Sequence, residues 1–305
     1  MIGRVVEIAE DGRHLSVERG FMVVKADGAE ATRVPLNDIA VVVANAHGIT
    51  YSNNLLVTLA ERGAGMVFCG RNHAPVAWLW PAAGHHAQTA RMEAQIKSTR
   101  PLAKRLWQSL VHAKVLQQAA VLEIAGKPSG GVAALARKVR SGDPENVEAQ
   151  AARRYWPLLM GLEFRRDVEA GGVNALLNYG YTVLRAATAR AVMAAGLHPS
   201  LGIYHRTRTD PLCLASDLME PFRPMIDLAA ARLAETGDGE LDPDSKRALV
   251  AVLAADMETA RGTTPLITCL ERLAASLAAA YEAGEATLDL PRGVLALDAA
   301  RIGRA

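Results

Sequence analysis

The chain has 305 residues, of which 50% are hydrophobic and 22% are charged, a balance that supports one large or two ordinary globular domains and excludes intrinsic disorder. Its three cysteines, Cys69, Cys213 and Cys269, are odd in number and far apart, which excludes a disulfide scaffold, and the lack of a C-x-x-C pair argues against a cysteine zinc site. There is no uncharged apolar run of membrane-spanning length and no signal-peptide pattern, so we expect a cytoplasmic protein that does not associate with a membrane.

The first 80 residues have the short apolar runs and turn residues typical of strands. Strands are expected at 4–8, 15–18, 21–24, 40–43, 66–69 and 76–80, with Asp11-Gly12 and Asp27-Gly28 as turns. Ser52 is the expected N-cap of a helix over 53–62, which ends at Gly63.

Residues 81–90, with their proline, glycine and two histidines, are the predicted linker. Beyond them the apolar residues recur with the period of a helix. Helices are expected at about 91–99, 101–126, 130–140, 144–163, 173–195, 213–235, 243–259 and 263–283. The predicted fold class is α+β, with a small β-rich domain over 1–80 followed by a larger all-α catalytic domain over 91–305.

Glu148 is the first candidate site residue. Asp143 and Pro144 have the residue types of an N-cap and a first helical position, which would put Glu148 in the second turn of a helix. It precedes Ala152 and Tyr155 at helical spacing and so shares the predicted apolar stripe. A buried carboxylate there needs a metal or a charged partner. The alternative is an edge glutamate paired with a nearby arginine.

The segment 196–211 is expected to be a long loop that contains His198 and His205. Reactive groups are often found on loops held by a rigid scaffold. His205 is the better candidate, because His198 precedes a proline in an ordinary turn. Either histidine could instead be a plain surface residue.

Asp217 and Glu220 lie three residues apart and would share one face of a helix beginning near Ser216. Pro221 and Pro224 are tolerated only near such a beginning. The same spacing also fits a capping box, in which Glu220 would only bond a backbone amide.

Together Glu148, His205 and Glu220 would form a mixed oxygen and nitrogen ligand set, which favours Mg²⁺ or Mn²⁺. Such a metal could polarise a phosphoryl oxygen, activate the attacking water or hydroxyl, and stabilise the leaving oxygen. Sequence spacing does not show that the three side chains meet.

The charge distribution is consistent with a polyanion as a partner, which together with a metal site would make a phosphodiester the natural substrate. Residues 91–154 have a net charge of +7, against −1 for residues 1–90 and −4 for residues 155–305. This excess is typical of a surface that binds a polyanion, although a solvated helix face would look the same. The candidate backbone contacts, which would be sensitive to salt and indifferent to sequence, are Lys97, Arg100, Lys104, Arg105, Arg137, Lys138 and Arg140, with Lys114 at the same helical spacing. Trp107 and Trp156 have core spacing and are expected to pack rather than to stack on bases.

Four ordered segments resemble the CRISPR-associated endonuclease/integrase of the spacer-adaptation module, the Cas one family, in its type II form. They are Asn146–Trp156, Asn174–Tyr181, Gly196–His205 and Leu214–Pro224. Asp210 departs from the pattern, since asparagine is more usual before this proline, but the three ligand positions are intact.

The resemblance implies a metal held by Glu148, His205 and Glu220, with Asp217 as a second-tier residue that orients a ligand or a metal-bound water. It also implies a homodimer that assembles with a dimer of a small second adaptation protein. The implied reaction is transesterification, in which the 3′-hydroxyl of a captured double-stranded DNA fragment attacks the edge of a repeat. The alternatives are a stand-alone nuclease or transposon-type integrase, and a non-catalytic DNA-binding scaffold.

Overall fold

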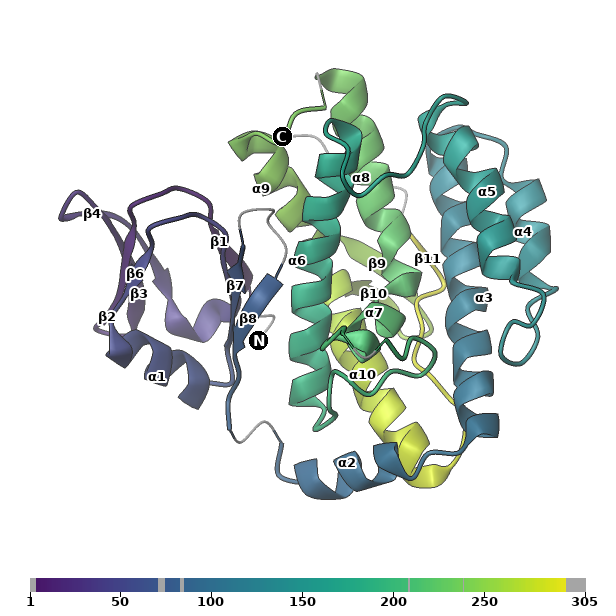
Figure 1. Cartoon of the computed structure of the whole chain (residues 1–305), viewed down its shortest axis with the longest axis horizontal. Coiled ribbons are helices and arrows are strands. Elements are labelled where there is room, and N and C mark those ends of the chain that lie inside the picture. Colours follow the sequence, from purple (N-terminus) through teal and green to yellow (C-terminus); the bar gives the residue numbers. More distant parts are fainter. Residues whose placement is uncertain (1–3, 71–74, 83–84, 208, 238, 295–305) are drawn as a thin grey trace. The chain divides into compact units, whose positions relative to one another are not determined.

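The computed structural model describes residues 4–70, 75–82, 85–207, 209–237 and 239–294. The chain divides into two compact units, residues 1–88 and 89–305 (Figure 1). The division falls within the segment 81–90 that the sequence predicts as a linker, of which residues 83 and 84 lie outside the described ranges. The α+β fold class is confirmed: the first unit is rich in strands and the second is mostly helical.

The first unit contains two four-stranded sheets. The first sheet has the order β1-β5-β7-β8, with β8 antiparallel to its neighbour, and the second has the order β4-β3-β2-β6. The strands are β1 (Arg4–Ile8), β2 (His14–Glu18), β3 (Phe21–Ala26), β4 (Ala29–Pro35), β5 (Ile39–Ala44), β6 (Thr50–Tyr51), β7 (Gly65–Cys69) and β8 (Pro75–Leu79). Between them lie the 3₁₀ turn η1 (Leu36–Asp38) and helix α1 (Asn53–Glu61).

The local chemistry of this unit follows the sequence closely. The side chain of Ser52 accepts the N–H of Leu55 and caps α1, as expected. All residues of β5 are buried, which explains why this strand is a continuous apolar run rather than an alternating one. Strand β4 was not predicted, because it is largely exposed and polar and so lacks an apolar pattern.

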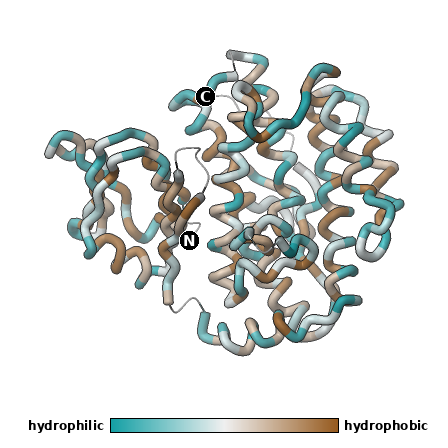
Figure 2. Tube along the Cα trace, in the orientation of Figure 1, coloured by the Kyte–Doolittle hydropathy of each residue, from teal (hydrophilic) through white to brown (hydrophobic). Residues whose placement is uncertain are grey.

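The second unit is built mainly from helices. These are α2 (Gln88–Ile96, whose first residue closes the preceding unit), α3 (Arg100–Ile124), α4 (Gly130–Ala136), α5 (Val147–Met160), α6 (Val173–Ala194), α7 (Cys213–Leu218), α8 (Arg223–Thr236), α9 (Pro243–Ala251) and α10 (Leu266–Ala283), with the 3₁₀ turns η2 (Glu220–Phe222) and η3 (Val252–Ala254). Brown hydrophobic and teal hydrophilic segments alternate along them in Figure 2, as amphipathic helices require. No helix in the described part of the chain combines the length and apolarity needed to span a bilayer.

Two of the predicted helices differ most from the structure. The segment 213–235 is broken into α7, η2 and α8, because Pro221 and Pro224 cannot continue a helix and instead begin new turns. The segment 243–259 ends at Ala251, and a three-stranded sheet follows, formed by β9 (Asp256–Thr259), β10 (Gly262–Pro265) and β11 (Gly293–Val294). The hydroxyl of Thr259 donates to the carbonyl of Gly262 at 2.7 Å and closes the hairpin, which the sequence analysis missed.

Helix α6 is the central element of this unit and contacts α7, α8, α9 and α10 (Figure 1). Its approach to α8 depends on Gly180. A Cβ added there would lie 2.4 Å from Cγ2 of Ile226, which is closer than any real contact allows. Glycine at this position therefore sets how closely the two helices pack.

One residue after this glycine, a buried polar pair links the same two helices. The hydroxyl of Tyr181 donates to the carboxyl of Asp227, which is buried in α8. Burial raises the pKa of Asp227 to about 7, although the Tyr181 hydroxyl and the Arg223 guanidinium each act to lower it. Asp227 therefore titrates near neutral pH within the core.

This titration predicts a pH dependence of stability. Because the folded-state pKa lies above the unfolded value of about 4, the folded state holds the extra proton between these values, and stability falls as pH rises from about 4 to 7. The slope for one proton is about 1.4 kcal/mol per pH unit at most. Urea denaturation at several pH values measures the free energy of unfolding of the wild type and of Asp227→Asn. The variant should lack the fall in this free energy between about pH 4 and pH 7.

The Tyr181→Phe variant is the matched control. It removes a hydrogen bond that lowers the Asp227 pKa, so the decline should extend to higher pH. Parallel pH profiles for the wild type and Asp227→Asn would contradict the prediction.

Candidate active site

The turn before α5 places Glu148. The N-cap is Asn146, and the carboxylate of Asp143 accepts the N–H groups of Val147 at 2.8 Å and Glu148 at 3.0 Å. The helix thus begins at Val147 rather than at Pro144, and Glu148 lies in its first turn rather than the second. Two acidic or amide side chains cap this end, so the position of Glu148 is well fixed.

Lys114 of α3 lies between the two candidate carboxylates. Its ammonium is 2.6 Å from Oε1 of Glu148 and 2.5 Å from Oε2 of Glu220. The two carboxylate oxygens are therefore separated by no more than the sum of those distances, although their residues are far apart in the chain. The side chains are 10%, 21% and 3% exposed for Lys114, Glu148 and Glu220, so the cluster is largely desolvated.

Glu220 has a second cationic partner. Arg223 lies 3.1 Å from its other oxygen, Oε1, and the Arg223 guanidinium also covers the ring of Tyr181. Burial by itself would raise the pKa of Glu220, but the charges of Arg223 and Lys114 outweigh it and lower the pKa. Each oxygen of Glu220 therefore faces a cation, Oε2 the Lys114 ammonium and Oε1 the Arg223 guanidinium.

Asp217 anchors the loop that contains His205. Its Oδ2 accepts the N–H groups of Ile203 at 2.6 Å and Tyr204 at 2.9 Å, and its Oδ1 accepts the N–H of His205 at 3.3 Å. A capping box is therefore wrong for Asp217 and Glu220: Asp217 lies inside α7 and bonds another segment. Gly202 permits this, since a Cβ there would lie 2.1 Å from the carbonyl oxygen of His205.

The same carboxylate orients the ring of His205. Nδ1 lies 2.5 Å from Oδ1 of Asp217, so Nδ1 carries the proton and Nε2 is the nitrogen left for a ligand. The hydrogen bond with Asp217 raises the pKa of His205, burial lowers it, and the charges of Glu220 and Glu148 add to the rise. The charges of both glutamates therefore act on the imidazole, but the direct contacts of His205 are with Asp217, Trp107 and Tyr204.

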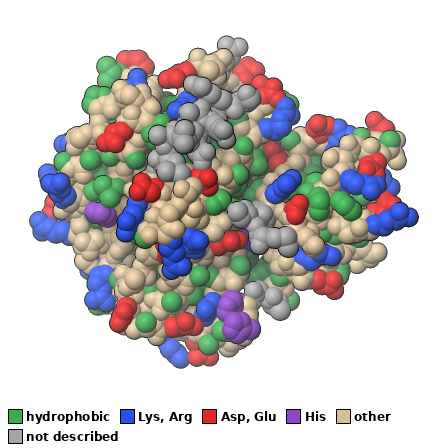
Figure 3. Space-filling view, turned by 180° about the vertical axis from the view of Figure 1, so that it is seen from behind, with side chains coloured by type: hydrophobic (Ala, Val, Ile, Leu, Met, Phe, Trp, Pro, Cys, Tyr) green, Lys and Arg blue, Asp and Glu red, His purple; other side chains and the backbone are tan. Residues whose placement is uncertain are grey.

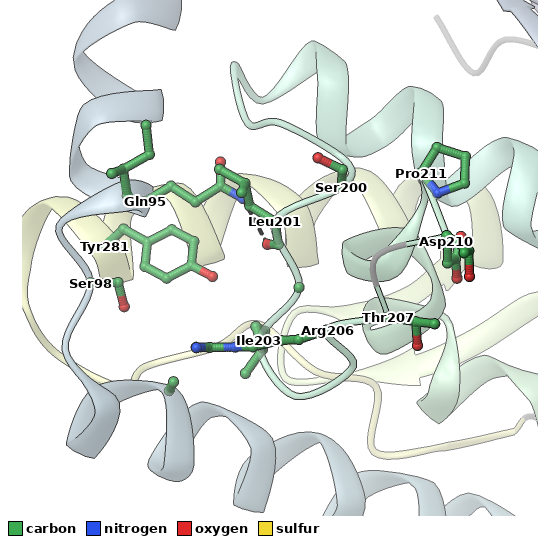
Figure 4. A pocket seen from close by; sticks show the side chains of 14 residues that line it. Gln95, Ser98, Ser200, Leu201, Ile203, Arg206, Thr207, Asp210, Pro211 and Tyr281 are labelled. Atoms are coloured by element: carbon green, nitrogen blue, oxygen red, sulfur yellow. Dashed lines mark hydrogen bonds between the residues drawn. The ribbon is translucent and has the colours of Figure 1, made fainter.

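Residues of other elements also hold the loop 196–211 in place. Gln95 of α2 accepts the N–H of His198 and donates to the carbonyls of His198 and Leu201. Asp210 pairs with Arg185 and accepts the N–H of Leu212, so its role lies in loop geometry. Between α2 and the loop lies a cavity of about 710 Å³, where Gln95 and Tyr281 face the loop (Figure 4).

The donor types fit a divalent cation only in part. Glu148 and Glu220 already hold one cation, the Lys114 ammonium, at the point where their oxygens converge, and the imidazole of His205 has a free nitrogen. Within the described ranges, however, no three histidine, cysteine or acidic side chains are close enough to hold a metal. The metal ligand set Glu148, His205 and Glu220 therefore stays a prediction.

The predicted DNA-binding residues are all exposed. These are Lys97, Arg100, Lys104, Arg105, Arg137, Lys138 and Arg140. Figure 3 shows Lys and Arg side chains along the outer edge of the helical unit. Lys97 and Arg140 already have acidic neighbours, Glu93 and Glu145. Lys114 is the exception to the basic pattern, because it is buried between the two glutamates and cannot contact a DNA backbone from the surface.

Sequence reasoning missed Lys114, Arg223 and Gln95 as residues that shape the site. A signal for Lys114 existed: it follows Leu110 by four and Trp107 by seven, which puts it on the buried stripe of α3. A lysine on such a stripe needs a carboxylate partner. No comparable pattern marks Gln95, whose partners are backbone groups of a distant loop.

Solved structures with this fold include a casposase bound to its integration product and a Cas1 protein from Thermotoga maritima. The casposase has a TM-score of 0.77 at 18% identity, over 94% of this chain and 92% of that one. The Thermotoga protein has a TM-score of 0.72 at 15% identity, over 93% of this chain and 99% of that one. At these identities the likeness concerns the fold.

The sequence comparisons go further. A protein named CRISPR-associated endonuclease Cas1, from Neisseria meningitidis serogroup C, is 36% identical over 89% of this chain and 90% of its own length. One from Pyrobaculum aerophilum is 29% identical over 82% of this chain and 89% of its own length. The family model described as CRISPR associated protein Cas1 matches residues 6–248. The chain therefore belongs to the Cas1 family, as the four sequence motifs indicated.

Proposed function

We propose that this protein is a divalent-metal-dependent DNA integrase and endonuclease of CRISPR spacer acquisition. It would join the 3′-hydroxyl ends of captured DNA to the repeat by transesterification, and with water as the nucleophile it would cut DNA. Family membership supports the biological role, and the 36%-identical relative is itself named an endonuclease. The observation that carries the chemical proposal is the convergence of Glu148 and Glu220 on one cation, with an oriented His205 whose pKa both glutamate charges raise.

The residues of the chain have distinct tasks in this proposal. Asp217 keeps the proton of His205 on Nδ1, so that Nε2 faces a ligand as a neutral donor. Arg223 holds Oε1 of Glu220, which leaves Oε2 to point at the shared cation. The exposed lysines and arginines of α3 and of the segment 137–140 would neutralise DNA phosphates nearby.

Glu148, Glu220 and His205 would hold the Mg²⁺ or Mn²⁺, with Asp217 acting through His205. When bound, the metal would supply Lewis acidity to the reacting phosphodiester. Lys114 has the role of a resident counter-charge, since two desolvated carboxylates this close repel each other without a cation between them.

We also propose that the protein works as a homodimer with the small second adaptation protein. A structural neighbour described as a Cas6-RT-Cas1–Cas2 complex has a TM-score of 0.73, over 94% of this chain and 36% of that one. The assembly is that of the neighbour, and the present chain shares the fold of the component that it matches.

The decisive experiment is a strand-transfer assay with short DNA that has free 3′-hydroxyls, a supercoiled repeat plasmid and Mn²⁺, with and without the small partner. Wild-type protein should join the strands, and His205→Ala and Glu220→Gln should reduce joining at least a hundredfold. Glutamine is preferred at position 220 because it keeps the size and one acceptor oxygen of the side chain. Alanine would remove the buried partner of Lys114 and Arg223 altogether and would unfold part of the site.

Arg247→Gln is a suitable control, since this exposed arginine of α9 pairs with Asp244 and belongs neither to the ion cluster nor to the predicted DNA-binding residues. Full metal-dependent joining by His205→Ala or Glu220→Gln would overturn the assignment. DNA binding that is unaffected by Mn²⁺, with no joining by the wild type, would instead favour the non-catalytic scaffold. Joining without a repeat would favour a transposon-type integrase.

The counter-charge role of Lys114 gives a separate prediction. In Lys114→Met the two carboxylates lose their shared cation, and breaking such a buried pair costs about 3 kcal/mol. Added Mn²⁺ should restore much of the loss, because it takes the place of the ammonium. Thermal unfolding of the variant with and without Mn²⁺ measures both effects.

Lys97→Met is the matched control, because it removes a lysine from an exposed pair with Glu93 and should cost under about 0.5 kcal/mol with no response to Mn²⁺. If Lys114→Met were as stable as the wild type, or if Mn²⁺ failed to raise its melting temperature more than that of Lys97→Met, the role would be refuted.

A further inference from the structure

The residue before His205 presents an aromatic ring to solvent. Tyr204 is 51% exposed, and among the residues that the structure describes it is the only aromatic one in the set of exposed large hydrophobic side chains. A single exposed side chain of this kind is ordinary on a protein surface and needs no explanation by itself. Its place in the chain, next to the candidate catalytic imidazole, makes it a feature to explain.

The ring of Tyr204 is supported from one side. It stacks on the indole of Trp107 with ring centroids 4.3 Å apart and planes within 3° of parallel. Trp107 is only 1% exposed and belongs to the core of α3. Trp107 is thus a packing residue, as its spacing predicted, and one face of its indole supports the exposed ring of Tyr204.

Half of the Tyr204 side chain stays exposed although one face of its ring is stacked on Trp107. The ring of His205 is perpendicular to both members of the stack, with centroids 5.6 Å from Trp107 and 5.3 Å from Tyr204. Because these distances are nearly equal, His205 lies beside the stack rather than over the outer face of Tyr204. The exposed area of Tyr204 is therefore its outer face and part of its edge.

The ring is also held in place before any ligand arrives. The N–H of Tyr204 donates to Asp217 at 2.9 Å, and the N–H groups of both neighbours bond the same carboxylate. A fixed ring loses little conformational entropy when a second ring stacks on it. Trp107, Tyr204 and the buried Asp217 together form a pre-ordered stacking surface.

We propose that Tyr204, backed by Trp107, is a stacking site for a nucleobase that has left its duplex next to the reacting phosphodiester. This inference rests on the proposed function, because it takes DNA as the substrate. A base stacked on Tyr204 would be joined through its sugar to a phosphate beside His205. The site would therefore select DNA whose bases are unpaired at the reacting position, and it would tolerate any base, since every base has a flat face.

A binding assay without metal or chemistry tests the site. The probe is a DNA duplex with 2-aminopurine in an unpaired terminal segment, and a fully paired duplex of the same length serves as the reference. Wild-type protein should quench the 2-aminopurine, and Tyr204→Leu, which still covers Trp107 but has no aromatic face, should abolish the quenching. Affinity for the unpaired-end DNA should fall roughly tenfold, while affinity for the paired duplex changes less than twofold.

Tyr204→Phe is the matched control, since it keeps the ring and removes only the hydroxyl, and it should behave as the wild type. Equal quenching by Tyr204→Leu and the wild type, or an equal loss of affinity for both duplexes, would overturn the stacking site. So would a change in oligomeric state of Tyr204→Leu in size-exclusion chromatography, because the ring would then belong to a protein interface.

The outcomes separate this inference from the proposed function. If the wild type joins strands but Tyr204→Leu binds, quenches and joins as well as the wild type, the stacking site is wrong and the integrase stands. If the wild type never joins strands, the integrase fails, while the quenching still decides whether Tyr204 binds a base.

Discussion

The site depends on one buried ionic contact, the Lys114 ammonium held between Glu148 and Glu220. It joins α3, α5 and η2, which are distant in sequence, and with Arg223 it balances two negative charges by two positive ones. Desolvating these groups is costly, so the contact adds little net stability by itself. What it provides is position: the two carboxylates can approach this closely only because a cation lies between them.

A second constraint acts on the loop that contains His205. A loop of this length would ordinarily be mobile, but Asp217 takes its backbone N–H groups at Ile203, Tyr204 and His205, and Gln95 holds its start. Gly202 is needed for the tight turn, because a side chain there would strike the loop's own backbone. The imidazole is thus oriented by buried structure rather than by its own short segment.

The sequence predicted most elements and the identity of the candidate residues, for physical reasons that differ between regions. Strands such as β5 and helices such as α6 have strong apolar patterns, whereas the β9–β10 hairpin consists of short polar runs that no period marks. The sequence pattern predicts the start of α5 three residues too early. Asp143 does accept an N–H group of the first turn, but it lies three residues before the actual N-cap, Asn146. Lys114 was interpreted as a surface residue, since charge alone does not reveal burial, and the meeting of Glu148 with Glu220 needs the tertiary fold.

Asp217 also explains why the reactive and the stacking groups would act as one unit. Its two oxygens hold the backbone of both Tyr204 and His205 and the ring of His205. Any shift of α7 would therefore move the imidazole and the exposed ring together, and their mutual geometry would be preserved. The ring of Tyr204 is therefore held at a fixed position relative to His205. A base stacked on this ring would place its adjacent phosphate at a defined distance from the imidazole. Tyr204 and His205 thus share one anchor, and the chemistry and the recognition of DNA would depend on the same buried carboxylate.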